Sequence, residues 1–195
     1  MTDAALHVLI IDDNAVRASV IEEGLREAGH EKVTVITDMG RLLPQIVQAD
    51  PDVIFIDLEN PNRDVLEQMF QVSRTVYRPV AMFVDHSDKA SIEAAIDAGV
   101  SAYVVNGMRK ERVKPILDMA ISRFNAFHRL RNELDRTKQA LEDRKVIDRA
   151  KGILMKSRGI AEEDAYALLR KTAMNESRRV ADVARALVTA AKLLG

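Results

Sequence analysis

The chain has 195 residues, no cysteine and a net charge of −1 at neutral pH. The absence of cysteine excludes disulfides, thiol catalysis and zinc–thiolate sites, and no apolar run approaches the about 20 residues that a membrane-spanning helix needs. The N-terminus lacks the basic and apolar regions of a secretory leader. These features predict a cytoplasmic protein without a membrane partner, built as one large or two small domains.

The charge is divided unevenly along the chain. Residues 1–111 contain 10 Lys and Arg against 19 Asp and Glu, a net charge of −9, whereas residues 112–195 contain 19 against 11, a net charge of +8. Such an asymmetry is typical of a basic binding surface joined to an acidic domain with another task. Mutual attraction of the two halves is the alternative, and we favour a polyanion as the partner of the basic half.

Five strongly apolar runs recur along the first half, and segments with helical periodicity lie between them. Strands that alternate with helices are typical of βαβ units and a parallel sheet. Apolar residues at nearly every position of a run fit this sheet, because helices cover both of its faces. The pattern therefore predicts an α/β domain with a five-stranded parallel sheet, whose strands lie in residues 7–12, 32–37, 52–57, 79–84 and 101–106.

Acidic side chains stand at the ends of two of these predicted strands. Asp12 and Asp13 end the first, and Asp57 ends the third. The carboxyl ends of parallel strands meet at one edge of a sheet, and converging carboxylates offer the oxygen ligands that Mg²⁺ prefers. Aspartates at strand ends also cap turns and helices, but a pair with a partner on another strand favours a cation site.

Residues 7–110 resemble the receiver domain of response regulators, on the strength of these acids and of the strand pattern. The resemblance implies that Asp12 and Asp13 bind the metal ion together with Asp57, and that Asp57 is the phospho-acceptor.

Two positions depart from the receiver pattern. Val84 stands near the end of the fourth strand, where receivers carry Thr or Ser, and Asn106 ends the fifth strand, where they carry Lys. A hydroxyl that follows the phosphoryl group and a cation that neutralises it are therefore missing. Phosphorylation without them loses its coupling to the opposite face of the domain. We expect control by a bound partner protein at least as much as by phosphorylation of Asp57.

A long helix without breakers follows Pro115. Apolar residues recur in it every seven positions, which is typical of a coiled coil. Its first turns are expected to pack on the sheet, but beyond about residue 125 the helix outruns a small sheet and its apolar stripe needs another partner. We favour a homodimer over packing within one chain. The predicted seam comprises Val113, Leu117, Ala120, Phe124, Phe127, Leu134 and Leu141.

The stretch "RKVIDRAKGILMKSRG", residues 144–159, reads as a helix that carries six basic residues and ends at a glycine. Two further amphipathic segments follow it, and together the three predict a small helical bundle. Unpaired charges are too costly to bury in such a core, so they are expected to form a cationic face suited to phosphate contacts. The residues assigned to this face are Arg144, Lys145, Asp148, Arg149, Lys151, Lys156, Arg170, Lys171, Arg178 and Arg179.

Residues 140–188 resemble the ANTAR domain, an RNA-binding antitermination module, notably in "RKVIDRAKGILM" and "AYALLRKTAM". The whole chain resembles the NasT-type nitrate-assimilation regulators of the AmiR/NasT family. This resemblance implies a regulator that binds hairpins in nascent leader mRNA and prevents transcription termination. It also implies control by a histidine kinase or by a sequestering nitrate-sensor protein. The expected domains are a receiver over 1–110, a coiled-coil connector over 111–143 and an ANTAR domain over 134–195.

A DNA-binding response regulator is the alternative, with the last two helices as a helix-turn-helix. The turn "AMNESRRV" is long for that motif, and the last helix has few groups for base edges. An enzyme is not expected, because neither a nucleophile–base pair nor a glycine-rich phosphate loop is recognisable. Tyr166 is the one aromatic residue after His128. This scarcity favours folded RNA, recognised by shape, phosphates and a few loop bases, over a single-strand reader.

Overall fold

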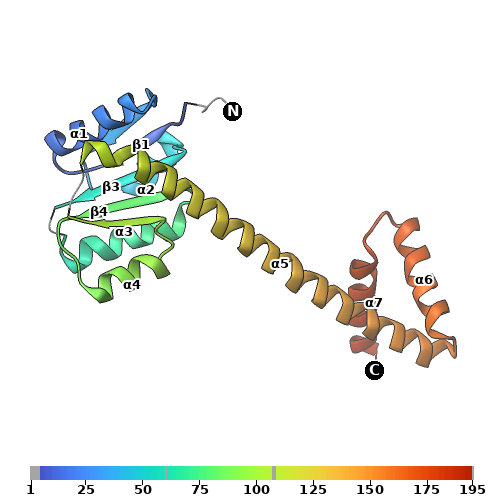
Figure 1. Ribbon diagram of the computed structural model, residues 1–195. Coiled ribbons are helices and arrows are strands. Elements are labelled where there is room, and N and C mark those ends of the chain that lie inside the picture. The colour runs from blue at the N-terminus through green and yellow to red at the C-terminus, as the bar shows by residue number, and fades with distance from the viewer. Residues whose placement is uncertain (1–4, 60, 107–108, 195) are drawn as a thin grey trace. The chain divides into compact units, whose positions relative to one another are not determined.

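The computed structural model of the chain describes residues 5–59, 61–106 and 109–194 (Figure 1). The chain divides into two compact units, Met1–His128 and Arg129–Gly195. Among the described residues, no helix combines the length and the apolar character that crossing a membrane requires.

The first unit contains a five-stranded sheet in which every neighbouring pair is parallel. The strand order is β2-β1-β3-β4-β5, so the chain reverses direction across the sheet between β1 and β3. Open α/β sheets bind their ligands beside such a reversal, at the carboxyl ends of the strands. The predicted fold is confirmed, with strands β1 Val8–Ile11, β2 Val33–Ile36, β3 Val53–Leu58, β4 Val80–Val84 and β5 Ala102–Val105.

Helices cover both faces of this sheet, which explains why its strands are apolar at nearly every position. Successive side chains of a strand point to opposite faces, so β1 sends Leu9 to one core and Ile10 to the other. The Leu9 face packs against α2, α3 and α4, and the Ile10 face packs against α1 and the start of α5 (Figure 1). The helices are α1 Ala15–Glu27, α2 Leu42–Ala49, α3 Arg63–Thr75, α4 Lys89–Asp97 and α5 Val113–Arg158, and a 3₁₀ turn, η1 Lys110–Arg112, precedes α5.

The first turns of α5 form part of the sheet's own core. Val113, Leu117 and Ala120 have no exposed surface, and they pack with residues of α1 and of the strands. Their assignment to a dimer seam was therefore wrong, because burial against the sheet stabilises them within one chain. The contact with α1 is close at Gly24, where an added Cβ would lie 2.7 Å from Val113 Cγ2.

The second unit is a three-helix bundle, as predicted. It consists of the last turns of α5 together with α6 Glu162–Asn175 and α7 Val180–Leu194. Its core is built around small residues such as Ala150, Ala165 and Ala184, all fully buried. Helix α5 ends at Arg158, and Gly159 follows with a positive φ of 65°, the left-handed conformation in which glycine commonly terminates helices.

Candidate functional site

Two carboxylates occupy adjacent positions at the carboxyl ends of β1 and β3. The register pairs Ile11 with Ile56, so Asp12 and Asp57 come next on neighbouring strands. Asp12 has no exposed surface and Asp57 is 4% exposed. The switch point between β1 and β3 therefore carries concentrated, desolvated negative charge, as the sequence predicted for this edge of the sheet.

The environment of Asp57 favours its neutral form. The pKa of Asp57 is raised from 3.8 to about 6, mainly by burial; the charges of Asp12 and Asp85 contribute to the rise and the charge of Arg17 opposes it. Desolvation disfavours a charged carboxylate, and a nearby like charge acts in the same direction. A nucleophilic role needs the ionised form. Near neutral pH the ionised carboxylate is available, but its burial makes it less stable than it would be in water.

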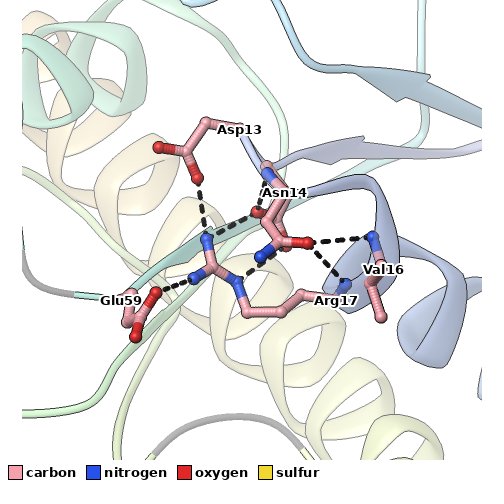
Figure 2. A network of polar contacts seen from close by, with 6 residues as sticks. Asp13, Asn14, Val16, Arg17 and Glu59 are labelled. Carbon is pink, nitrogen blue, oxygen red and sulfur yellow. Dashed lines mark hydrogen bonds and ion pairs between the residues drawn. The ribbon is translucent and has the colours of Figure 1, made fainter.

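Arg17 connects three carboxylates of the acidic site that Asp12, Asp13, Asp57 and Glu59 form at the ends of β1 and β3 (Figure 2). Its Nη2 lies 2.7 Å from Asp12 Oδ1 and 2.8 Å from Asp13 Oδ1, and its Nη1 lies 2.7 Å from Glu59 Oε2. The backbone N–H of Asn14 donates to Asp12 Oδ1 at 2.8 Å. Asn14 also caps α1, since its side-chain oxygen accepts from the N–H of Val16 at 2.9 Å. The hydrogen bond to Asp12 holds the pKa of Arg17 well above its usual range.

Sequence reasoning missed Arg17. The available signal was its spacing of four residues from Asp13, which precedes the N-cap of α1, so that Arg17 in the first turn can reach it. The contact with Glu59 joins α1 to the segment after β3, and no local pattern indicates it.

The predicted metal site is not assembled in this arrangement. Within the described ranges, no group of three or more His, Cys, Asp or Glu side chains is placed to hold a metal ion. Asp13 is 66% exposed and turns to Arg17, and Asp12 directs both of its oxygens to the same guanidinium. Asp12, Asp13 and Asp57 as they stand do not fit a shared cation, because an arginine takes the position between the acids.

The two positions that depart from the receiver pattern lie where the sequence placed them. Val84 ends β4 and is fully buried. As a valine, it offers no hydroxyl to the acidic site. Asn106 follows β5 with a positive φ of 75°, and its backbone N–H donates to the carbonyl of Asp85 at 3.3 Å. The nearby hydroxyls of Ser87 and Tyr103 are 3.0 Å apart and bond to each other.

The basic residues that the sequence assigned to the RNA-binding face fall into two groups. The first group consists of exposed cations, and among the residues that the structure describes no carboxylate lies within ion-pairing distance of them. Arginine and lysine in this state keep their donors free for phosphate oxygens. This free group comprises Arg144, Arg149, Lys156, Arg170 and Lys171.

The second group already has acidic partners within the protein. Lys151 is the clearest case, because its side chain is 16% exposed and its Nζ lies 2.6 Å from Asp148 Oδ1 and 2.7 Å from Glu162 Oε1. The pair with Glu162 joins α5 to α6, and a role of Lys151 in RNA binding stays a prediction. The other pairs are Lys145–Glu142 at 2.8 Å, Arg178–Glu176 at 3.0 Å and Arg179–Asp182 at 3.0 Å.

A shallow hollow of about 290 Å³ runs along the exposed side of α6. Tyr166 and Met174 supply exposed apolar surface to it, and Arg170 and Lys171 of the free group line it as well. A planar aromatic ring beside unpaired cations can stack on a nucleic-acid base while the cations bind the neighbouring phosphates.

The remaining residues of the predicted seam separate into packed and exposed ones. Phe124 packs within its own chain, with its ring centroid 6.0 Å from that of Tyr77 and 4.0 Å from that of His128. Phe127, Leu134 and Leu141 are each more than half exposed. The stripe available to a second copy is therefore shorter than predicted, and its use in a dimer stays a prediction.

Comparisons with known proteins divide the chain into two domains that correspond to its two compact units. Residues 8–118 match the response regulator receiver domain, and residues 135–188 match the ANTAR domain. The transcriptional regulatory protein PdtaR of Mycobacterium tuberculosis is 31% identical over 186 residues, which cover 93% of this chain and 91% of that protein. The nitrate regulatory protein of Klebsiella oxytoca is 40% identical over 76 residues, or 39% of this chain and 19% of that protein.

Solved structures agree on the fold of the first unit. A CheY-like receiver domain from Methanospirillum hungatei superposes with a TM-score of 0.53 at 16% identity, over 63% of this chain and 99% of that one. NtrX from Brucella abortus gives a TM-score of 0.54 at 20% identity, over 69% of this chain and 30% of that one. With the matched domains and the full-length relative, this places the chain in the family of response regulators that join a receiver domain to an ANTAR domain.

Proposed function

We propose that this regulator binds hairpins in nascent leader mRNA and prevents transcription termination. The observation that carries the proposal is the free group of exposed cations on the ANTAR bundle, Arg144, Arg149, Lys156, Arg170 and Lys171. Neutralising phosphates releases counterions from a nucleic acid, and this release drives binding. The relative that matches almost the whole chain is a transcriptional regulator by name, which supports an output at the level of transcription.

The hollow on α6 supports RNA over DNA as the partner. Unpaired loop bases stack on aromatic and guanidinium planes, and Tyr166 lies beside Arg170 in this hollow. In this proposal a loop base stacks on Tyr166, while the free cations hold the phosphates of the stem. A nascent transcript is made in the cytoplasm, where we therefore place the protein.

The receiver is the proposed input. Asp57 is the position for phosphorylation by a histidine kinase, and a sequestering sensor protein is the second route of control. The buried Val84 favours the second route, since it offers no hydroxyl to report a phosphoryl group. The partial match to a nitrate regulatory protein supports nitrate or nitrite assimilation as the process under control.

A salt series with RNA and DNA tests the proposal. Binding of the leader hairpin of the neighbouring operon is compared with binding of duplex DNA of the same sequence. We expect the wild type to prefer RNA. In Arg149→Ala and in Lys156→Ala, the slope of log affinity against log salt should become shallower by about 0.7–0.9 for each phosphate contact removed. Arg131 is an exposed arginine of the same helix that lies outside the bundle core. Arg131→Ala is therefore the matched control and should leave the slope unchanged.

Equal or tighter binding to DNA would contradict the proposal. It would instead favour a regulator of transcription initiation. Tyr166→Ala separates the two contributions, because loss of stacking weakens the hairpin complex without changing its salt slope.

A further inference from the structure

The acidic site of the receiver contains its own cation. Asp12 is fully buried, and a buried carboxylate is stable when a partner charge and hydrogen bonds compensate for its lost hydration. Arg17 supplies that charge from within the chain, since its Nη2 lies 2.7 Å from Asp12 Oδ1 and its Nε lies 3.4 Å from Asp12 Oδ2.

The guanidinium takes the acceptor positions that a divalent cation would use. Asp12 Oδ1 accepts from Arg17 and from the N–H of Asn14, and Asp13 Oδ1 accepts from the same Nη2 at 2.8 Å. Mg²⁺ requires oxygen ligands at about 2.0–2.1 Å in a nearly octahedral arrangement. A metal ion would compete with Arg17 for Asp12 Oδ1 and Asp13 Oδ1, and Figure 2 shows Asp13 turned to the guanidinium.

Arg17 is held in place from two sides. It belongs to the first turn of α1, a helix capped by Asn14 and packed into the core through Ala18 and Ile21. At its other end, Nη1 bonds Glu59 Oε2 at 2.7 Å, and the side chain as a whole is 24% exposed. A cation attached to the scaffold loses little freedom when it binds, and its effective concentration at the acids does not depend on the solution.

We propose that Arg17 is the resident counter-ion of this receiver and takes the place of a divalent cation at its acidic site. Asp12 then keeps a counter-charge at any Mg²⁺ concentration. Arg17 also ties α1 to the segment after β3 through Glu59, a link that a free metal ion would not provide. The inference concerns the receiver alone and holds whether or not the ANTAR bundle binds RNA.

Cation titrations of the full chain test the proposal. Mn²⁺ and Mg²⁺ are titrated into wild type, Arg17→Ala and Arg17→Lys, with binding followed by calorimetry and the receiver's melting temperature recorded at constant ionic strength. We expect wild type to show neither saturable binding at millimolar Mg²⁺ nor a shift in melting temperature. Arg17→Ala should melt lower without metal and regain stability as Mn²⁺ or Mg²⁺ is added, with affinity at least about tenfold higher than wild type.

Two variants make the result specific. Arg26→Ala removes an arginine of the same helix that pairs with Glu22 on the surface, 2.7 Å away, and should behave as wild type toward both metals. Arg17→Lys keeps the charge and should keep metal affinity low. Saturable binding of Mg²⁺ to wild type at millimolar or lower concentration would overturn the proposal even if Arg17→Ala fails to fold, and so would a folded Arg17→Ala without increased cation affinity.

Discussion

At the scale of single residues, the receiver's chemistry depends on how Asp57 carries its charge. The side chain is almost completely buried, and burial together with the neighbouring acids raises its pKa to about 6. In the folded state this carboxyl binds a proton more tightly than in the unfolded chain. Its contribution therefore favours folding at low pH, declines as pH rises from about 4 to 6, and stays unfavourable above pH 6.

Replacing Asp57 with Asn should stabilise the protein in a pH-dependent way. A pKa that moves from 3.8 to about 6 corresponds to about 3 kcal/mol in the free energy of unfolding above pH 7, and about half of this at pH 5. Urea denaturation of wild type and Asp57→Asn at pH 5 and pH 7.5 measures the difference. An equal gain at both values would mean that the charge of Asp57 is not the cause.

Lys151 and Lys156 lie on the same helix but should respond differently to substitution. Lys151 is paired with Asp148 and Glu162, so Lys151→Ala should lower the melting temperature of the bundle and weaken RNA binding through that loss. Lys156 is exposed, and Lys156→Ala should weaken RNA binding with an unchanged melting temperature. Thermal unfolding beside hairpin binding distinguishes them. Identical behaviour of the two variants would contradict the division into paired and free cations.

At the scale of elements, α5 serves three environments along one continuous helix. Its first turns are core of the receiver through Leu117, its middle exposes Leu134, and its last turns are core of the bundle through Ala150. A regular heptad pattern gave no means of separating these environments, because each of them needs an apolar residue at the same spacing.

Two glycines within helices should respond in opposite directions to alanine. In a helix, alanine is favoured over glycine by about 0.5–1 kcal/mol, and Gly152 has open space around its Cα, so Gly152→Ala should stabilise by that amount. At Gly24 the new Cβ would lie 2.7 Å from Val113 Cγ2 and 3.1 Å from the carbonyl oxygen of Lys110. Overpacking of this kind costs about 1–3 kcal/mol, so Gly24→Ala should destabilise. Chemical denaturation of both variants checks the signs.

The elements themselves were predictable from the sequence, and the partners of several side chains were not. Continuous apolar runs define the strands, and the strand order places Asp12 beside Asp57. The role of Arg17 was not predicted, because one of its partners, Glu59, lies 42 residues away in the sequence. The pairing of Lys151 was not predicted, because one of its partners, Glu162, belongs to the next helix. Ion pairs between two elements depend on how those elements pack, so the spacing of residues within one element does not predict them.

At the scale of the whole molecule, an acidic receiver of charge −9 within residues 1–111 is joined to a basic remainder of +8. Each part carries the sign that its own site requires, since the receiver concentrates carboxylates at the strand ends and the bundle concentrates free cations. The exposed stripe of Phe127, Leu134 and Leu141 is the feature through which two chains are predicted to associate.

A charged residue in this stripe should dissociate the predicted dimer. Leu134 is about half exposed in the single chain, so Leu134→Glu costs little within it but places two buried charges in a dimer seam, which is strongly unfavourable. Analytical ultracentrifugation should show a monomer with unchanged helix content. Asn132→Glu, an exposed position on the same helix away from the stripe, is the control. A wild type that is monomeric with and without RNA would contradict the dimer.

The backbone at Asn106 bears on how this receiver can evolve. Asn and Lys codons differ at a single base, so the lysine of ordinary receivers is genetically one step away. Asn106 has a φ of 75°, a left-handed conformation that asparagine tolerates and that costs most other residues about 1–2 kcal/mol. A mutant with lysine here would have to strain or rebuild the turn after β5 before the ammonium reached the acidic site. We therefore expect Asn106→Lys by itself to lower stability without restoring the usual receiver contact.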